Sequence, residues 1–400
     1  MIHFLKTVLC AVWFGQILSI SAQNVPPPTS KNSPSAIQLP QLRESTEISL
    51  ITYTPGEELY QAFGHSAIRV KDDRLGIDRL YNFGTFDFGT PNFYLKFAHG
   101  DLLYQLVVSS GEDEIQRVGA YGQGVTEVPL NLSVDQKQRL FKALEINLLP
   151  ENRFYRYDFV LDNCSTRIRD VFEKITGIPI QENNARQLTF RQMLDVYFIR
   201  IPWTHFGVDL LLGSTMDRVA SPREACFLPA DLERAVQSSK NGDRNLAGEK
   251  RELFSPEMLP QPIWFLSPSV LFSGGGLLWF LIWLLRGRRH ARRVTVLYLT
   301  VLGAVGVFVC IFSFWSQHRV VHENYNPLWL IPIHFLVGLW VFFAKPNLVR
   351  WYFRVALIAA LGFLAFSFLL PQVFHAAVYP LVIVLAWRCA LEIIPKIARA

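Results

Sequence analysis

Residues 159–177 read FVLDNCSTRIRDVFEKITG, and this stretch decides how the first half of the chain folds. Apolar residues recur in it with the spacing of one helix face, and Gly177 ends the pattern. The residues that lead into it and overlap its start, RFYRYDFV (153–160), read as an extended segment. The sequence therefore predicts an extended segment followed by a helix, with Cys164 at the first turn of that helix. Asp162 or Asn163 can cap it, because both side chains accept hydrogen bonds from first-turn N–H groups.

The residues around this junction, from 46 to 238, have the pattern of a folded water-soluble domain. Short β-rich runs alternate with helical patterns, and Ser133 can cap a second helix. This mixture predicts an α+β domain of about 190 residues, which is long enough to bury its own core. The predicted strands are EISLITYTP (47–55), SAIRV (66–70), RLYNFGTFDF (79–88), LLYQLVVSS (102–110) and GVTEVPLNL (124–132).

The composition of the whole chain is too apolar for an ordinary soluble protein. The 400 residues are 50% hydrophobic, with a mean hydropathy of +0.22 and a net charge of +6. Much of the positive charge is concentrated in RGRRHARR (286–293), which lies between long apolar runs. This position favours a cytoplasmic loop of a membrane protein over a nucleic-acid-binding segment.

The first 22 residues predict a secretory signal peptide, with an uncleaved membrane helix as the alternative. One lysine precedes an apolar stretch, and small residues follow where a peptidase could cut. Residues 23–45 are rich in Pro, Ser, Asn and Gln, which is typical of a flexible linker. Residues 239–262 are polar and then contain prolines, and we interpret them as a second linker.

Residues 263–400 predict an all-α membrane domain of five helices. Five apolar stretches are long enough, or nearly so, to cross a bilayer. Loops rich in Lys and Arg stay in the cytoplasm, so the arginine-rich loop and the C-terminus are expected there. The predicted location is a bacterial inner membrane, with the folded domain in the periplasm. The expected spans lie near 263–285, 294–315, 327–344, 352–370 and 376–394.

Cysteine is scarce, and only Cys164 and Cys226 lie in the folded domain. A disulfide between them is one interpretation, because the compartment is oxidising, and a buried unreactive thiol is another. The third is a nucleophile, because a helix N-terminus stabilises a thiolate and its N–H groups can hold an oxyanion. A cysteine nucleophile needs a base. The domain offers three histidines, His65, His99 and His205.

Two stretches, GHSAIRV (64–70) and DNCSTRIRD (162–170), together resemble the Lnb family of lipoprotein N-acyltransferases of the Bacteroidota. Residues 79–106 and the segment HENYNPLWLIP (322–332) of the membrane domain share this resemblance. It implies a permuted papain-like fold, similar to those of NlpC/P60 and lecithin–retinol acyltransferase enzymes. In such folds the catalytic histidine precedes the cysteine.

The resemblance also implies roles for individual residues. Cys164 is expected to be the nucleophile and His65 its base. Asn82, on the following strand, is expected to orient the histidine, with Asp87 as the alternative.

Substrate contacts are expected around this site and at the membrane surface. Arg69 and Arg167 are candidates for binding a lipid phosphate, with solvated strand and helix faces as the alternative. Asp162 and Asn163 border the cysteine and are assigned to the same group. In the loop after the second span, polar residues either complete the site from below or only cap helices and contact water. These loop residues are His322, Asn324 and Asn326.

The functional hypothesis is transfer of an acyl chain from a membrane phospholipid, through a Cys164 thioester, to the N-terminal amine of a diacylated lipoprotein. The residues alone support a cysteine-dependent acyl-transfer enzyme, and the two substrates come from the resemblance. The alternatives are a membrane-tethered cysteine hydrolase of peptidoglycan peptides and a non-enzymatic envelope scaffold. No cofactor, metal ion or nucleic acid is expected, because the sequence has no metal-ligand spacing and no glycine-rich nucleotide loop.

Overall fold

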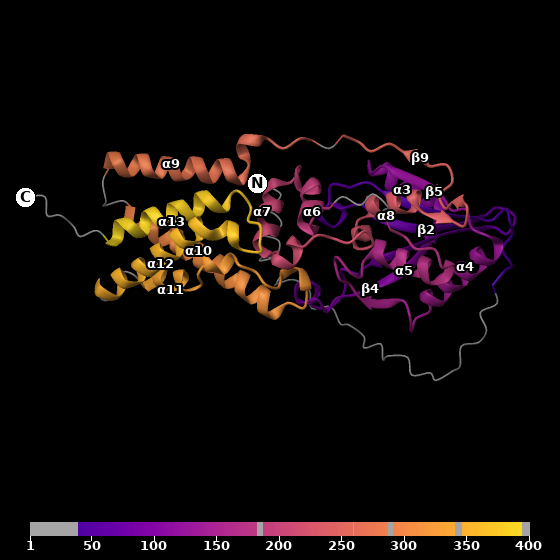
Figure 1. The fold of residues 1–400 in the computed structure, drawn as a ribbon, viewed down its shortest axis with the longest axis horizontal. Coiled ribbons are helices and arrows are strands. Elements are labelled where there is room, and N and C mark those ends of the chain that lie inside the picture. The colour runs from indigo at the N-terminus through magenta and orange to yellow at the C-terminus, as the bar shows by residue number, and fades with distance from the viewer. Residues whose placement is uncertain (1–38, 182–186, 259, 287–290, 341–345, 394–400) are drawn as a thin grey trace, which may run out of the picture.

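A computed structural model of the chain describes residues 39–181, 187–258, 260–286, 291–340 and 346–393. Figure 1 shows a sheet-containing domain joined end to end to a bundle of long helices. The predicted signal peptide and most of the first predicted linker lie outside the described residues. The described part confirms the predicted order, in which an α+β domain is followed by a helical region.

The sheet is antiparallel and has seven strands in the order β6-β4-β3-β2-β1-β5-β9. Side chains alternate between its two faces, so Ile68 faces one side while Ala67 and Arg69 face the other. The bounds are β1 (Glu47–Tyr53), β2 (His65–Asp72), β3 (Ile77–Thr85), β4 (Leu103–Ser110), β5 (Val125–Pro129), β6 (Phe154–Arg156) and β9 (Arg251–Phe254).

Helices cover both faces of this sheet. On one face, α4 (Val134–Leu148) and α5 (Cys164–Thr176) pack over the largest apolar core, which includes Ile68. On the other face, α3 (Gly111–Ala120) packs over a smaller core, which includes Ala67. Because α5 rests on β2 and β3, the first residue of α5 has a fixed position relative to both strands.

The structure differs from the prediction in the segment 239–262. Here β7 (Lys240–Asn241) and β8 (Arg244–Asn245) form a small hairpin, and β9 pairs with β5 at one edge of the sheet. Leu246, between them, is fully buried. β9 is an edge strand, and β7 and β8 pair only with each other, so all three can be short and largely polar, and their composition resembles that of a linker.

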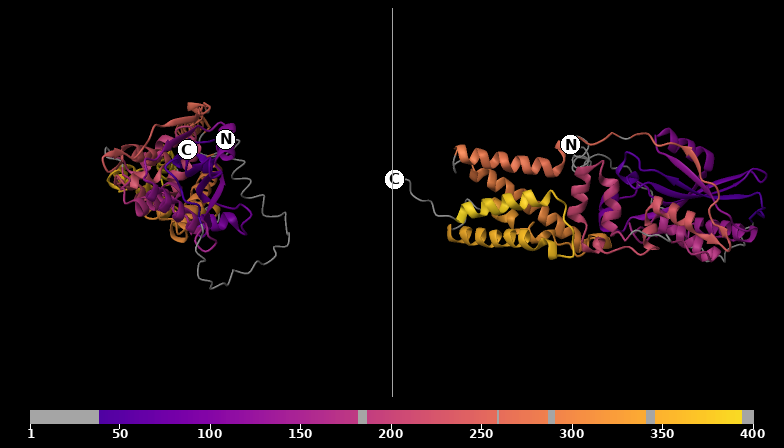
Figure 2. Two further views of the ribbon diagram at one scale, coloured as in Figure 1. Left: turned by 90° about the vertical axis from the view of Figure 1, so that its right-hand side faces the viewer. Right: turned by 45° about the horizontal axis from the view of Figure 1, so that its top comes forward.

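Three further helices follow α5 in the chain, namely α6 (Phe190–Phe198), α7 (Pro202–Leu211) and α8 (Pro229–Ser238). α8 packs against α5 and β1, whereas α6 and α7 lie between the sheet and the bundle. Figures 1 and 2 show α6 and α7 crossing the long axis of the molecule, which the bundle helices follow. α6 and α7 therefore form a layer at the junction of the two parts.

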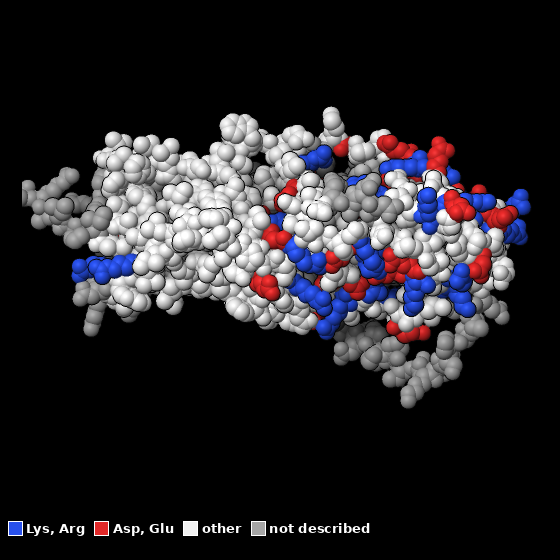
Figure 3. Space-filling model, viewed as in Figure 1, with Lys and Arg blue, Asp and Glu red and all other residues white. Residues whose placement is uncertain are grey.

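The bundle contains five helices among the described residues, three of which are long and apolar enough to cross a membrane. These three are α9 (Pro268–Arg286), α10 (Ala291–Trp315) and α12 (Pro346–Phe366). The other two are α11 (Ile333–Trp340) and α13 (Val378–Ile393), and each ends at the last residue of a described range. The five spans therefore stay a prediction. Figure 3 shows charged residues gathered over the sheet domain, with few on the visible face of the bundle. This distribution is typical of a bundle that lies in a bilayer.

The third predicted span, 327–344, begins later than expected. Residues Asn326–Leu328 form a 3-10 turn, and α11 starts at Ile333, directly after Pro332. Trp329 lies between the two and is almost fully buried. An apolar run can be buried in a protein core as well as in lipid, and hydropathy alone does not separate the two.

Hydrogen bonds join the sheet domain to the bundle where α10 ends. The Gln317 N–H donates to the carbonyl of His99 (2.7 Å), and the Ser316 hydroxyl donates to the carbonyl of Ala98 (2.8 Å). Gly100, which follows α2 (Phe93–His99), has φ +95°, and a Cβ there would lie 3.2 Å from Gln317 Cβ. The short helix α2 is therefore held directly against the end of α10.

A second contact between the two parts, at Gly213, is closely packed. The Gly213 N–H donates to the carbonyl of Val320 (2.9 Å), and a Cβ at Gly213 would lie only 1.7 Å from the His322 oxygen. We expect Gly213→Ala to force α7 away from this loop and to lower the free energy of unfolding by about 1–3 kcal/mol. The measurement is the thermal unfolding midpoint of the detergent-solubilised protein.

The matched control is Gly207→Ala, within α7 itself. An added Cβ at Gly207 has no heavy atom within 4 Å. Because alanine is the better helix former, this change should leave the midpoint unchanged or raise it. An unchanged midpoint for Gly213→Ala would contradict the described packing.

Candidate active site

Cys164 is the first residue of α5, and its neighbour Asn163 caps the helix. The Asn163 side chain accepts a hydrogen bond from the Thr166 N–H (2.9 Å), and the Thr166 hydroxyl accepts one from the Asn163 N–H (2.7 Å). The Asn163 amide also donates to the carbonyls of Phe159 and Phe227, both at 2.8 Å. Asn163 is buried, so the structure gives it a capping role, and its contact with substrate stays a prediction.

His65 is the first residue of β2, and its ring reaches Cys164. Gly64 before it has φ +76°, and a Cβ there would lie 2.4 Å from the Tyr53 oxygen, so this turn requires glycine. The His65 ring lies beside the Cys164 side chain, close enough for each group to shift the pKa of the other. Its Nε2 atom lies 3.3 Å from Asn82 Oδ1, which leaves Nδ1 for the thiol. The three residues thus stand in the order cysteine, histidine, asparagine.

Asn82 lies on β3, and its side-chain amide is held on both sides. While Oδ1 faces His65, Nδ2 donates to the Ser109 hydroxyl on β4 (3.4 Å). Asp87, the alternative partner for the histidine, is exposed and accepts a hydrogen bond from the Gly89 N–H (2.8 Å). The structure therefore brings Asn82, and not Asp87, to the histidine.

The electrostatics of the pair favour a thiolate beside an imidazolium. Burial alone would raise the pKa of the Cys164 thiol, but the neighbouring His65, by charge and by hydrogen bond, lowers it overall. The Ser66 N–H and the Ser165 hydroxyl add hydrogen bonds that lower it further. Burial alone would lower the pKa of His65, but Cys164, together with Asn82, raises it overall. A thiolate stabilised in this way is the form of cysteine that attacks carbonyl carbon.

The first turn of α5 also offers donors for an oxyanion. The capping hydrogen bonds already use the N–H groups of Asn163 and Thr166. The N–H groups of Cys164 and Ser165 are therefore the first-turn donors left for a ligand. The helix dipole favours negative charge at this end as well. The same turn can thus activate the nucleophile and stabilise a tetrahedral intermediate.

Two tyrosines that sequence analysis did not single out lie beside Cys164. A Cβ on Gly84, a residue of β3, would lie 3.6 Å from Cys164 Cβ and 3.7 Å from Tyr157 Cε2. The Tyr155 hydroxyl lies 3.8 Å from the same point. Tyr157 stacks in turn on Tyr104, with ring centroids 4.3 Å apart. The alternation in RFYRYDF, just before the cysteine, was the available signal, since it places both tyrosines on one face.

Arg69 does not have the predicted position for binding a lipid phosphate. It lies four residues along β2 from His65, roughly 13 Å away. It is almost fully buried and forms a bidentate ion pair with Asp78, with both distances 2.8 Å. Glu112 and Glu127 lie 3.3 and 3.5 Å from the same guanidinium. These three carboxylates already neutralise the arginine, so its role is to join strands and helix α3.

Arg167 lies one turn from Cys164 and forms a bidentate ion pair with Asp162, at 2.5 and 2.7 Å. The guanidinium carbon also lies 3.6 Å from the centre of the Tyr155 ring. Both charged side chains stay partly exposed. Because an anionic substrate would compete with Asp162 for the arginine, substrate binding by either residue stays a prediction.

The polar loop after α10 forms hydrogen bonds with α7, at the junction between the sheet domain and the bundle. The side-chain amides of Asn324 (2.8 Å) and Asn326 (3.2 Å) both donate to the carbonyl of Leu210 at the end of α7. His322 Nε2 lies 2.9 Å from the carbonyl of Ser316. Of the two interpretations that the sequence left open, these bonds support helix capping, and contact with substrate stays a prediction.

The remaining candidates lie outside the site. Cys164 and Cys226 are both free thiols, so the disulfide alternative is wrong. Cys226 is fully buried. His99 lies at the junction, with Nδ1 2.5 Å from Asp101 and its ring 4.5 Å from that of Trp315.

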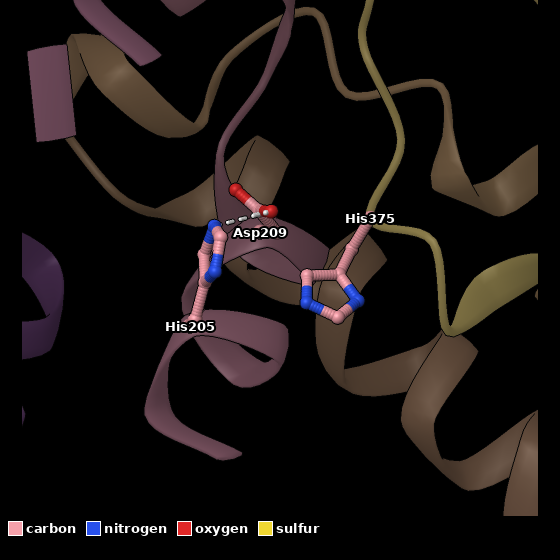
Figure 4. Close-up of side chains that lie close together, drawn as sticks. All are labelled: His205, Asp209 and His375. Carbon is pink, nitrogen blue, oxygen red and sulfur yellow. Dashed lines mark ion pairs between the residues drawn. The ribbon is translucent and has the colours of Figure 1, made fainter. Parts of the chain in front are cut away.

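The third histidine, His205, belongs to a separate cluster at the junction (Figure 4). His205, Asp209 and His375 point toward one another, and their ligating atoms all lie within 4.8 Å. These donor types suit a metal ion, but Asp209 is already paired with Arg191 at 2.6 Å. The Nδ1 atom of His375 accepts a hydrogen bond from the Ala377 N–H (3.0 Å). Since these bonds engage groups that a cation would need, we interpret the cluster as an ionic network between α7 and the bundle.

The thiolate–imidazolium pair predicts a measurable reactivity. Because the pKa of Cys164 is lowered by His65, the thiol should react with iodoacetamide at pH values below the ordinary thiol pKa of about 8.5. In His65→Ala the inflection of the alkylation rate should move to higher pH. The measurement is mass-spectrometric alkylation of Cys164 across pH, with Cys226 of the same sample as the buried internal control. The same inflection in both proteins would contradict the pairing.

The cluster around His205 predicts how stability depends on pH. Burial alone would lower the pKa of His205, but hydrogen bonds with Asp195 (3.0 Å) and Asp209 (3.1 Å) raise it to about 9. A pKa raised above the unfolded value of about 6.5 gives a contribution that is complete below that value. This contribution is lost as pH rises toward 9. We therefore expect the thermal unfolding midpoint to fall over this range, and to fall less in His205→Asn. Equal slopes in the two proteins would show that His205 carries no such charge.

Both parts of the chain have counterparts in one protein family. Residues 42–195, which include the cysteine, histidine and asparagine of the site, match the sequence model of the Lnb N-terminal periplasmic domain. Residues 261–399, which include the bundle, match that of the Lnb transmembrane domain. No curated protein and no solved structure matches the chain. The two matches follow each other in the order of the sequence and confirm the resemblance carried by the two motifs. The chain therefore belongs to the Lnb family, whose members join a periplasmic domain to a transmembrane domain.

Proposed function

We propose that the protein is a lipoprotein N-acyltransferase that carries an acyl chain on Cys164. The observation that supports this most directly is the contact of Cys164 with His65, and of His65 with Asn82, at the start of a capped helix. A thiolate, a base and oxyanion donors at one point are the parts that acyl transfer through a thioester needs. The choice of substrates rests on the resemblance to the Lnb family.

In the first half-reaction, the Cys164 thiolate attacks the carbonyl carbon of a phospholipid ester. A C–S bond forms, and the oxyanion accepts hydrogen bonds from the N–H groups of the first turn. When the tetrahedral intermediate collapses, the ester C–O bond breaks. The imidazolium of His65 gives its proton to the leaving alkoxide, so that a lysophospholipid departs and an acyl-thioester remains.

In the second half-reaction, the free α-amine of a diacylglyceryl-cysteine lipoprotein attacks the thioester carbonyl. A C–N bond forms and the C–S bond breaks, which regenerates the thiolate. His65, now neutral, takes the proton that the amine loses and becomes the imidazolium again. The product is a lipoprotein with three acyl chains, and the enzyme returns to its starting state.

The architecture suits this pair of substrates. Both are residents of the bilayer, so the site must lie near the membrane surface. The periplasmic domain is held to the end of α10 and to the loop after it by hydrogen bonds. A hydrolase of peptidoglycan peptides would use the same groups with water as the acceptor, and the products of the assay below separate the two reactions.

The test is conversion of a diacylated lipopeptide by the purified protein in vesicles of isotope-labelled phospholipid. We expect the lipopeptide to gain the mass of one labelled acyl chain, and the protein to carry a thioester that hydroxylamine releases. Cys164→Ser should abolish both, and His65→Ala should lower the rate by about 10²–10⁴-fold. Asn82→Ala should act in the same direction with a smaller loss, because it only orients the base.

Cys226→Ala serves as the control, since it removes a buried thiol of the same domain outside the site. Release of free labelled fatty acid without any gain in lipopeptide mass would indicate a hydrolase. An undiminished gain in Cys164→Ser would overturn the proposed nucleophile.

A further inference from the structure

We infer that an aromatic strip on the periplasmic domain binds the acyl chain of a membrane lipid and leads it from the bilayer to Cys164. This inference rests on the proposed function and names the binding surface for the chain that is transferred. The strip consists of Tyr60, Phe86, Phe88, Phe93, Tyr94, Phe97, Tyr104 and Tyr157.

One end of the strip lies at the nucleophile. Tyr157 borders Gly84, the residue where the backbone of β3 passes close to Cys164. Its ring stacks on Tyr104 at 4.3 Å, and Tyr104 meets Phe86 at 5.3 Å. Tyr104 is buried in the apolar core and Tyr157 is half-buried, so this end of the strip is an apolar wall beside the atom that would carry the chain.

From there the rings continue in contact toward the bundle. Phe86 meets Phe93 at 5.7 Å, and Phe93 meets Phe97 at 6.3 Å on the same helix, α2. Phe97 meets His318 at 6.1 Å, and the His318 ring also lies 2.7 Å from the Phe97 carbonyl oxygen. His318 follows the end of α10 by three residues.

The far end of the strip therefore lies at the level where a membrane span ends. Residues 293–315 of α10 are long and apolar enough to cross a bilayer. The residues that follow them, Ser316 and Gln317, donate to carbonyls of α2. α2 and its aromatic side chains thus stand at the boundary between the hydrocarbon core and the headgroups, where tyrosine and other aromatic rings are favoured.

The part of the strip that is farther from Cys164 is exposed in a way that a water-facing surface does not explain. Exposed fractions reach 61% for Phe88, 68% for Tyr94 and 49% for Phe97, and α2 has no buried residue at all. Leu95 on the same helix is 60% exposed. A cluster of large apolar groups of this kind marks a surface that something covers. Because the cluster is continuous with the end of a membrane span, we assign a lipid acyl chain as the occupant.

The first experiment detects the chain without requiring any chemistry. Full-length Cys164→Ser protein is placed in vesicles of a phospholipid that carries a photoactivatable group on its acyl chain, and cross-linked peptides are mapped. We expect cross-links on residues 86–104 in addition to those on the bundle helices. Cross-links confined to the bundle would overturn the inference.

The second experiment compares two acyl donors in the otherwise native protein. Phe88→Asp combined with Tyr94→Asp should lower the rate of Cys164 acylation from a long-chain phospholipid by about tenfold or more. Acylation by a short, water-soluble butyryl ester should stay unchanged, because that chain does not extend along the strip. Tyr121→Asp, on an aromatic residue that is 73% exposed outside the strip, should leave both rates unchanged. An equal loss with both donors, or no loss with either, would overturn the inference.

The two experiments also separate this inference from the proposed function. If cross-links appear on the strip but no lipopeptide gains a chain, the protein binds acyl chains and the proposed transfer fails. If the lipopeptide gains a chain but the strip is neither cross-linked nor sensitive to substitution, the transfer stands and the chain reaches Cys164 by another surface.

Discussion

The hydrogen bonds that cap α5 are the interaction on which the proposed chemistry depends. Asn163 and Thr166 exchange bonds at the start of the helix, and Asn163 also holds the carbonyls of Phe159 and Phe227. These bonds fix where the helix begins, so Cys164 cannot slide relative to β2 and β3. The position of the proposed nucleophile is thus set by neutral, buried contacts, and its charge by a separate partner, His65. Geometry and electrostatics are supplied by different residues.

Burial acts against both members of the pair, and local contacts reverse its effect. A thiol and an imidazole that are removed from water both prefer their neutral forms. Here each is close enough to the other to favour the charged form, and Asn82 and Ser66 add hydrogen bonds to the two ends. The comparison with Arg69 is instructive. Arg69 lies on the same strand as His65, but three carboxylates from other elements surround its guanidinium. They neutralise its charge and leave no group free to react.

The sequence predicted those parts of the structure that depend on local pattern. The α+β domain, the helical region after it and the helix that starts at Cys164 all follow from periodicity and capping residues. The family followed from two short motifs, because their residue types at fixed positions are specific. The permuted papain-like relationship, the five spans and the acyl transfer itself stay predictions. What the sequence missed depends on contacts between distant segments. Asn324 and Asn326 cap a helix more than a hundred residues earlier, and β9 joins the sheet from a segment that reads as a linker.

The direct attachment of α2 and α7 to the bundle has a consequence for which amines can react. A domain on a long flexible tether would sample many distances from the membrane and would meet the N-termini of soluble periplasmic proteins as often as those of lipoproteins. Here hydrogen bonds on both sides of the junction hold the domain at one height above the bilayer. For the proposed reaction, an acceptor must present its amine at that height, where a diacylglyceryl anchor keeps it and where a freely diffusing protein brings it only rarely. The distance of the amine from the membrane would then select the acceptor, and no recognition of the acceptor's amino-acid sequence would be needed.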